Sequence, residues 1–79
     1  MLTPMQKRVQ RYLWKYGPLT DEQLQRRLPN TPPSTVRSRR AELVDKHLVK
    51  HVAVRKNTRG RFVYAWKSTR APTTTRGAR

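Results

Sequence analysis

The stretch Thr31–His51, TPPSTVRSRRAELVDKHLVKH, contains the residues that decide the fold of this chain. Its two prolines are typical of a helix start, because the first N–H groups of a helix have no partner within the helix. After Lys46 and His47 the apolar period changes from about 3.6 residues to 2, which indicates a passage from helix to strand. The stretch therefore predicts a helix over residues 32–46 that leads directly into a β-strand.

The two sides of this predicted helix differ in character. At about 100° per residue, the inward side holds Val36, Leu43 and Val44, together with Arg40 and part of Arg39. The opposite side presents to solvent Ser34, Arg37, Ser38, Ala41 and Asp45. Because Arg40 interrupts the apolar side, we expect its guanidinium to reach solvent or to pair with an acid such as Glu22.

The charge balance indicates an anionic partner. The 79 residues include 19 Lys and Arg against four Asp and Glu, a net charge of +15. Residues 32–67 have ten basic and two acidic residues, or +8, whereas residues 68–79 have three basic residues and no acid, or +3. The excess therefore peaks inside the region that we expect to fold, and nucleic acid is the polyanion that best fits such a patch.

Composition also excludes several classes of protein. A hydrophobic content of 34% supports one small core but no enclosed substrate chamber. The absence of cysteine excludes disulfides and thiolate metal sites. No apolar run approaches the roughly 18 residues of a membrane span, and the N-terminus lacks the apolar region of a signal peptide. We expect a soluble cytoplasmic domain, nucleoid-associated or in a host cytoplasm if viral, without cofactor, metal or membrane contact.

The first helix is predicted over residues 4–16. Thr3 and Gln6 form a Thr-x-x-Gln capping box, and Pro4 suits the first helical position. One apolar stripe follows and consists of Met5, Val9, Tyr12, Leu13 and Tyr16.

The second helix is predicted over residues 21–28. Thr20 and Gln23 form another capping box, and Leu19 and Leu24 are spaced as a hydrophobic staple. A helix of about two turns is unstable alone and must pack on its neighbours.

A β-hairpin is predicted at residues 49–55 and 61–67, which are rich in β-branched and aromatic residues. The turn between them is cationic and ends at Gly60, so we expect it to be flexible. The aromatic residues suggest either core packing or stacking on unpaired bases, and we interpret as core Tyr12, Tyr16, Phe62, Tyr64 and Trp66. From Ser68 onward the composition predicts a disordered basic tail over residues 68–79.

These elements predict an α+β fold, a three-helix bundle with a helix-turn-helix and a two-stranded β-hairpin wing, over residues 1–67. The junction STVRSRRAELVDKHLV, residues 34–49, resembles the winged helix-turn-helix DNA-binding domains of small prokaryotic or phage type, which share a MarR- and ArsR-like core. The resemblance covers residues 3–67, about four-fifths of the chain. The chain departs from the family at Arg40, where an aliphatic residue is usual, and at His47, where glycine is usual, so His47 needs a left-handed or otherwise strained cap.

The resemblance implies that the third helix enters the major groove of double-stranded DNA and that the wing lies on the backbone or minor groove. It also implies a short strand near Leu19 that pairs with the wing. The chemistry of the residues agrees, since Arg37 suits guanine and Ser34 with the helix amides suits phosphate. The predicted contacts are Ser34, Thr35, Arg37, Ser38, Arg39, Ala41, Arg55, Lys56, Arg59 and Arg61.

Several functions fit this prediction. The first is a small transcriptional regulator, or an accessory factor in phage recombination or replication, that acts as a monomer or a weak assembly on DNA. The others are an RNA-binding or ribosome-associated protein and a module that binds a host protein. The small, basic face of the third helix favours DNA over a protein partner. We expect no enzyme, because four acids and two histidines form no recognisable catalytic or metal-binding pattern.

Overall fold

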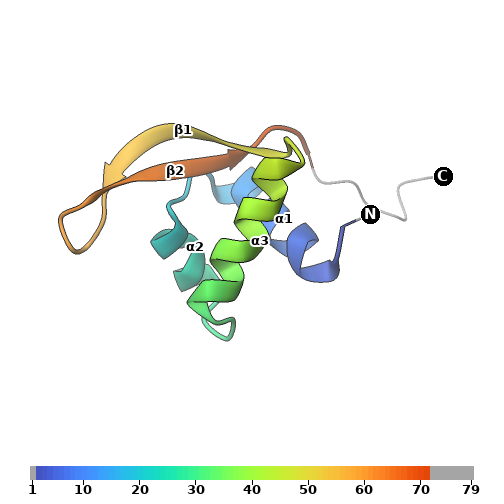
Figure 1. Cartoon of the computed structure of the whole chain (residues 1–79), viewed down its shortest axis with the longest axis horizontal. Helices are drawn as coiled ribbons and strands as arrows, with labels where there is room; N and C mark the ends of the chain where they lie inside the picture. The colour runs from blue at the N-terminus through green and yellow to red at the C-terminus, as the bar shows by residue number, and fades with distance from the viewer. Residues whose placement is uncertain (1, 72–79) are drawn as a thin grey trace.

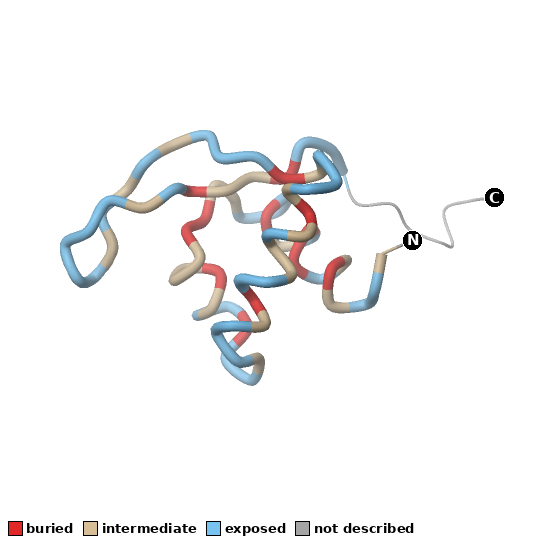
Figure 2. Tube along the Cα trace, in the orientation of Figure 1, coloured by how far each residue is buried: buried red, intermediate tan, exposed pale blue. Residues whose placement is uncertain are grey.

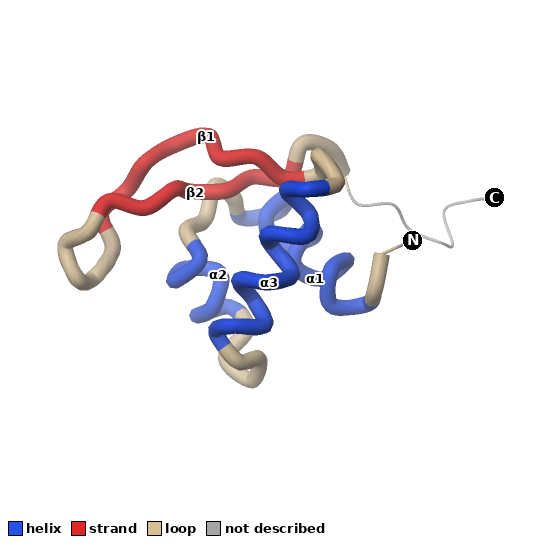
Figure 3. Tube along the Cα trace, in the orientation of Figure 1, coloured by secondary structure: helices blue, strands red, loops and turns tan. Residues whose placement is uncertain are grey.

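The computed structural model describes residues 2–71, which form three helices followed by an antiparallel hairpin (Figures 1 and 3). The elements are α1 Pro4–Tyr16, α2 Asp21–Arg27, α3 Pro33–Asp45, β1 Val49–Lys56 and β2 Phe62–Ser68. This arrangement confirms the predicted α+β class and is consistent with a winged helix. Every predicted element is present, with each end within one residue of its predicted position.

Local capping fixes the starts of α1 and α2. The Thr3 hydroxyl accepts a hydrogen bond from the Gln6 amide at 3.2 Å, and Gln6 Oε1 accepts one from the Thr3 amide at 2.8 Å. Thr20 and Gln23 repeat the same exchange at 3.1 and 3.0 Å. Both predicted capping boxes are therefore confirmed, and each fixes the first turn of its helix through residues three positions apart.

The core lies where the three helices and the base of the hairpin face one another, as the buried segments in Figure 2 show. Its buried side chains are Val9, Leu13, Leu19, Leu24, Leu28, Val36, Leu43 and Val49. Partly buried side chains that pack against it include Met5, Tyr12, Val44, Leu48 and Trp66. Because Val36 and Leu43 anchor α3 from within, the opposite side of this helix is left to solvent.

Strands β1 and β2 pair in antiparallel register, with Val54 opposite Tyr64 and a register shift between His51 and Ala53. The body of the protein adds one more pairing to the hairpin. The Leu19 amide donates to the Trp66 carbonyl at 2.9 Å, and the Trp66 amide donates to the Leu19 carbonyl at 2.7 Å. The expected pairing of Leu19 with the wing is therefore confirmed, as an isolated bridge and not as a strand. The bridge joins β2 to the loop that precedes α2. The hairpin turn lies farther out, past α2, at the left of Figure 1.

The prediction that the aromatic residues are core is wrong for three of them. Phe62 is 73% exposed, Tyr64 is 50% exposed and Tyr16 is 38% exposed. On β2, Ala65 is fully buried, and Trp66 packs partly against the core. Successive side chains of a strand point to opposite faces, so Phe62 and Tyr64 share a face with Trp66. On this face Arg40 of α3 covers the Trp66 ring. The rings of Phe62 and Tyr64 are therefore surface features.

The end of α3 takes the unusual conformation that the sequence required. His47 has a φ of 62°, in the left-handed region where glycine is favoured. The Leu48 amide donates to the Leu43 carbonyl and the His47 amide donates to the Val44 carbonyl, both at 2.9 Å. These two bonds form a Schellman motif, which turns the chain from α3 into β1.

The predicted start of the tail at Ser68 is wrong. Ser68 is the last residue of β2 and is buried. Its hydroxyl donates to the Arg70 carbonyl at 2.6 Å, and the next amide, that of Thr69, donates to the Leu48 carbonyl at 2.9 Å. Packing against the end of α3 therefore extends the folded unit past residue 67, and residues 72–79 of the predicted tail lie outside the described residues.

Candidate nucleic-acid interface

The outer face of α3 has the composition that the sequence predicted. Its exposed residues are Ser34, Arg37, Ser38 and Ala41, and Thr35 is half-buried beside them. Because Arg37 stands among short side chains, its guanidinium can approach a partner without obstruction from its own helix. The face can therefore present one long cation and several small hydrogen-bonding groups to a groove.

The N-terminus of α3 offers fewer free amides than we expected. Pro32 caps this helix without a side-chain hydrogen bond, and Pro33 has no N–H. The amides of Thr35 and Val36 both donate to the Pro32 carbonyl, at 3.0 and 3.1 Å. Anion binding at this end must therefore depend more on the Ser34 and Thr35 side chains than on the backbone.

Arg40 is a structural residue, and its partner is Asp21 rather than Glu22. Its Nε donates to Asp21 Oδ1 at 2.9 Å and its Nη2 donates to Oδ2 at 2.6 Å. Its guanidinium carbon also lies 4.1 Å from the centre of the Trp66 ring. The expectation of an acidic partner is confirmed, but Glu22 extends to the hairpin turn, so Asp21 is the acid within reach. Arg40 thus joins α3, α2 and β2.

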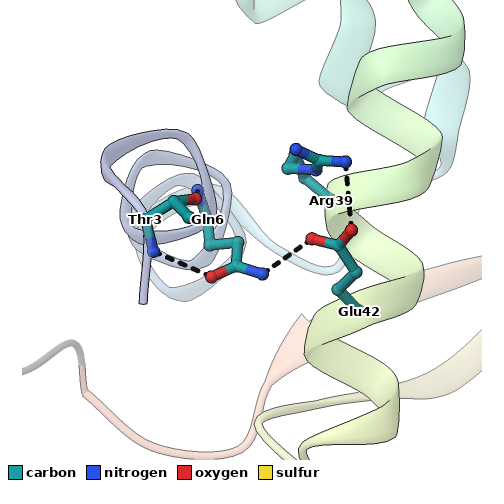
Figure 4. Close-up of polar contacts among 4 residues, drawn as sticks. All are labelled: Thr3, Gln6, Arg39 and Glu42. Atoms are coloured by element: carbon teal, nitrogen blue, oxygen red, sulfur yellow. Dashed lines mark hydrogen bonds and ion pairs between the residues drawn. The ribbon is translucent and has the colours of Figure 1, made fainter. Parts of the chain in front are cut away.

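Arg39 lies on another side of α3 from Arg37. Figure 4 shows Arg39 and Glu42 extending from α3 toward α1. Arg39 Nη2 lies 3.0 Å from Glu42 Oε2, and Gln6 Nε2 donates to Glu42 Oε1 at 2.6 Å. This predicted contact residue is therefore engaged at the α1–α3 junction, where its charge is offset by a carboxylate.

The four hairpin cations that were predicted as contacts divide into one bound residue and three exposed ones. Arg55 Nη1 donates to the Pro18 carbonyl at 2.8 Å and to Gln23 Oε1 at 3.1 Å, so Arg55 fastens β1 to the body. The exposed cations at the turn are Lys56, Arg59 and Arg61.

The backbone of the turn is held by hydrogen bonds within the turn itself. The Asn57 carboxamide oxygen accepts hydrogen bonds from the amides of Arg59 and Arg61, both at 2.9 Å. Gly60 has a φ of 80°, which permits the tight reversal. The turn is therefore a hydrogen-bonded backbone that carries exposed cations.

Glu22 holds this turn against α2. The Thr58 hydroxyl donates to Glu22 Oε2 at 2.5 Å, and the Thr58 amide donates to Oε1 at 3.2 Å. These two bonds lower the pKa of the Glu22 carboxyl below its ordinary value of 4.5, and the hydroxyl bond has the larger effect. The charges of Arg26 and Arg59 lower the pKa further. The contact therefore depends on an ionised carboxylate.

We expect acid to release the turn. Because the folded pKa of Glu22 is depressed, its stabilising contribution is present above its ordinary pKa and is lost as pH falls through the folded pKa. An NMR titration of the Thr58 amide should show a transition below pH 4.5 that disappears in Glu22→Gln. Thr58→Ala should move the carboxyl pKa back toward its ordinary value. A Glu22 carboxyl that titrates at or above 4.5 in the native chain would contradict the contact.

A half-open groove of about 640 Å³ separates the start of α3 from the hairpin, with α2 at its floor. It brings together two of the predicted contact residues, Arg37 from α3 and Arg59 from the turn. Tyr64 and Trp66 of β2 line the same groove, and sequence reasoning missed both as site residues because it assigned them to the core. The available signal was the alternation of Phe62, Tyr64 and Trp66 on one strand face.

Among residues 2–71, no three side chains of His, Asp or Glu lie together as a group that could hold a metal ion. None of the described helices has the length and apolarity to cross a membrane. Comparisons with protein-family models, with curated proteins and with solved structures found no match to this chain.

Proposed function

We propose that the protein binds double-stranded DNA as a winged helix-turn-helix domain, either as a small transcriptional regulator or as an accessory factor in DNA transactions. The observation that supports this best is the shared groove of Arg37 and Arg59, one from α3 and one from the hairpin turn. In this proposal α3 enters the major groove, and the hairpin contacts the adjoining backbone or minor groove.

The dimensions and chemistry of α3 suit this role. The major groove of B-DNA is about 12 Å wide and admits one helix. Short side chains at Ser34, Ser38 and Ala41 let the helix approach the base edges closely. Arg37 is then the residue with the reach and the paired donors to bind guanine O6 and N7. In this arrangement the hairpin turn contacts the phosphates beside the major groove of the DNA through Lys56, Arg59 and Arg61.

The structure also limits which cations take part. Arg40 and Arg39 are paired with Asp21 and Glu42, and Arg55 is bound to the body. We therefore assign phosphate binding to the exposed cations and a scaffold role to these three arginines. The net charge of +15 remains large enough to give binding without sequence preference as a baseline.

A salt titration tests the proposal. If the domain neutralises roughly five to eight phosphates, log K for a duplex should fall against log[salt] with a slope of about −4.5 to −7. The slope is to be measured by fluorescence anisotropy on duplex DNA, with duplex RNA of equal length as competitor. A slope near zero would contradict nucleic acid as the partner, and preferential binding of duplex RNA would contradict DNA.

A further inference from the structure

The hairpin face that borders the groove carries aromatic rings that are largely exposed. We define the aromatic face as His51, Val54, Phe62 and Tyr64; Val54 is the register partner of Tyr64, and the His51 ring stacks on Tyr64. Phe62 and Tyr64 are at least half exposed, and Val54 is 57% exposed. Large apolar side chains gathered at the surface mark an interaction site more often than single exposed ones do.

The rings are arranged so that two of them remain open to a partner. The His51 ring stacks on Tyr64 at 4.3 Å with 24° between the planes, and Tyr64 meets Trp66 edge to face at 5.7 Å. Trp66 is already occupied, because the Arg40 guanidinium covers its ring. Phe62 contacts no other ring among the described residues, and the Lys56 ammonium lies 5.5 Å from its centre. Phe62 and the uncovered side of Tyr64 are therefore the free stacking surfaces.

The surroundings of the aromatic face identify the charge of its partner. Lys56 lies opposite Phe62 in the hairpin register, and Arg61 directly precedes Phe62. Tyr64 shares its groove with Arg37 and Arg59. Protein interfaces are depleted in lysine at their centres, whereas a cationic track with interleaved aromatic rings is typical of single-stranded nucleic acid binding.

We propose that the aromatic face binds a single-stranded nucleic acid segment by stacking unpaired bases on Phe62 and Tyr64. The inference deepens the proposed function, on which it rests, by adding a second form of nucleic acid at the hairpin. In a duplex the flat faces of the bases are covered by their neighbours, so only unpaired bases can stack on these rings.

The spacing of the rings supports an extended strand. Residues two apart on a β-strand are about 6.7 Å apart, roughly twice the 3.4 Å rise per nucleotide of a helical strand. Bases that stack on successive rings of β2 must therefore be separated from one another, as they are in an extended single strand. The phosphates between them would then pass the exposed cations of the turn.

The test compares two ligands and matched variants of the full chain. The ligands are a labelled oligothymidine and an abasic strand of equal length, which has the same phosphates but no bases. Phe62→Ala and Tyr64→Ala should each weaken oligothymidine binding about 5- to 150-fold, the range for loss of one base–aromatic stack. Both should leave abasic-strand binding nearly unchanged, and Phe62→Ala, which lies outside the groove lining, should also leave duplex binding nearly unchanged. Val54→Ala, on the same face, should change no affinity by more than about twofold, since valine cannot stack.

A conservative variant separates stacking from apolar contact. Phe62→Leu keeps most of the apolar area and removes the ring, so it should lose nearly as much oligothymidine affinity as Phe62→Ala. The inference is overturned if Phe62→Leu binds like the native chain, or if the native chain binds the abasic strand as tightly as oligothymidine. Circular dichroism should show each variant folded, because the substituted rings are largely exposed.

Failure here and failure of the proposed function give different results. If the native chain binds duplex DNA, but Phe62→Ala and Tyr64→Ala do not change the affinity for oligothymidine, only the stacking inference is overturned. Base-dependent binding of oligothymidine without any duplex binding overturns the proposed function and supports the aromatic face as the binding site.

Discussion

Leu43→Ala should destabilise the domain by about 2–5 kcal/mol, the range for truncation of a fully buried leucine. Leu43 is fully buried on the inward side of α3, and its carbonyl accepts the Leu48 amide in the turn that leads to β1. A domain of this size has a stability of roughly 4–12 kcal/mol. The variant therefore loses a large part of its stability, which urea denaturation followed by circular dichroism should measure as a lower midpoint at similar slope.

Val54→Ala is the matched control for this substitution. It also shortens an aliphatic side chain, but at a position that is exposed on β1. We expect it to cost less than about 1 kcal/mol, mostly through the lower strand propensity of alanine. A loss at Leu43 no greater than the loss at Val54 would contradict the placement of α3 in the core.

Arg37→Ala should cost about 1–3 kcal/mol on a preferred duplex site and much less on random DNA. The reason is that Arg37 is the long donor on the outer face of α3, where the proposed bidentate contact with one guanine would carry sequence information. The preferred site is to be selected from a random duplex library with the native chain. Affinities of both proteins for this site and for a scrambled duplex then give the specificity ratio.

Arg59→Ala separates base recognition from phosphate binding. Arg59 lines the same groove from the hairpin turn, and we expect it to neutralise a phosphate. Its loss should weaken binding to the selected and to the scrambled duplex by similar amounts. The slope of log K against log[salt] should become less steep by about one unit. Equal losses on selected and scrambled duplexes for Arg37→Ala would make Arg37 a phosphate contact as well, and base recognition would then lie elsewhere on α3.

The features that the sequence predicted well are those that depend on residues close together in the chain. The capping boxes at Thr3 and Thr20 involve residues three positions apart, so their geometry follows from the local chain. The left-handed residue at His47 was implied by the resemblance, since the family usually has glycine at this position. The outward side of α3, with Arg37, followed from helical periodicity alone.

The features that the sequence did not predict depend on contacts between residues that are distant in the chain. The partner of Arg40 was assigned to Glu22, yet Glu22 is held by Thr58, which lies 36 residues away, and this leaves Asp21 for the arginine. The exposure of Phe62 depends on which strand face the helices cover, and an aromatic strand has the same pattern in either case. The engagement of Arg55 with Pro18 has no local signal at all.

Three of the four acids are turned toward internal donors, since Asp21 meets Arg40, Glu22 meets Thr58 and Glu42 meets Gln6 and Arg39. Three of the four carboxylates are thereby occupied within the fold, and the net charge of +15 makes the field of the molecule positive over long range. A polyanion that diffuses toward such a surface is drawn in before any contact forms, which raises the rate of encounter and makes that rate fall with ionic strength. The contacts that hold the scaffold together thus leave few carboxylates free to repel a polyanion at close range.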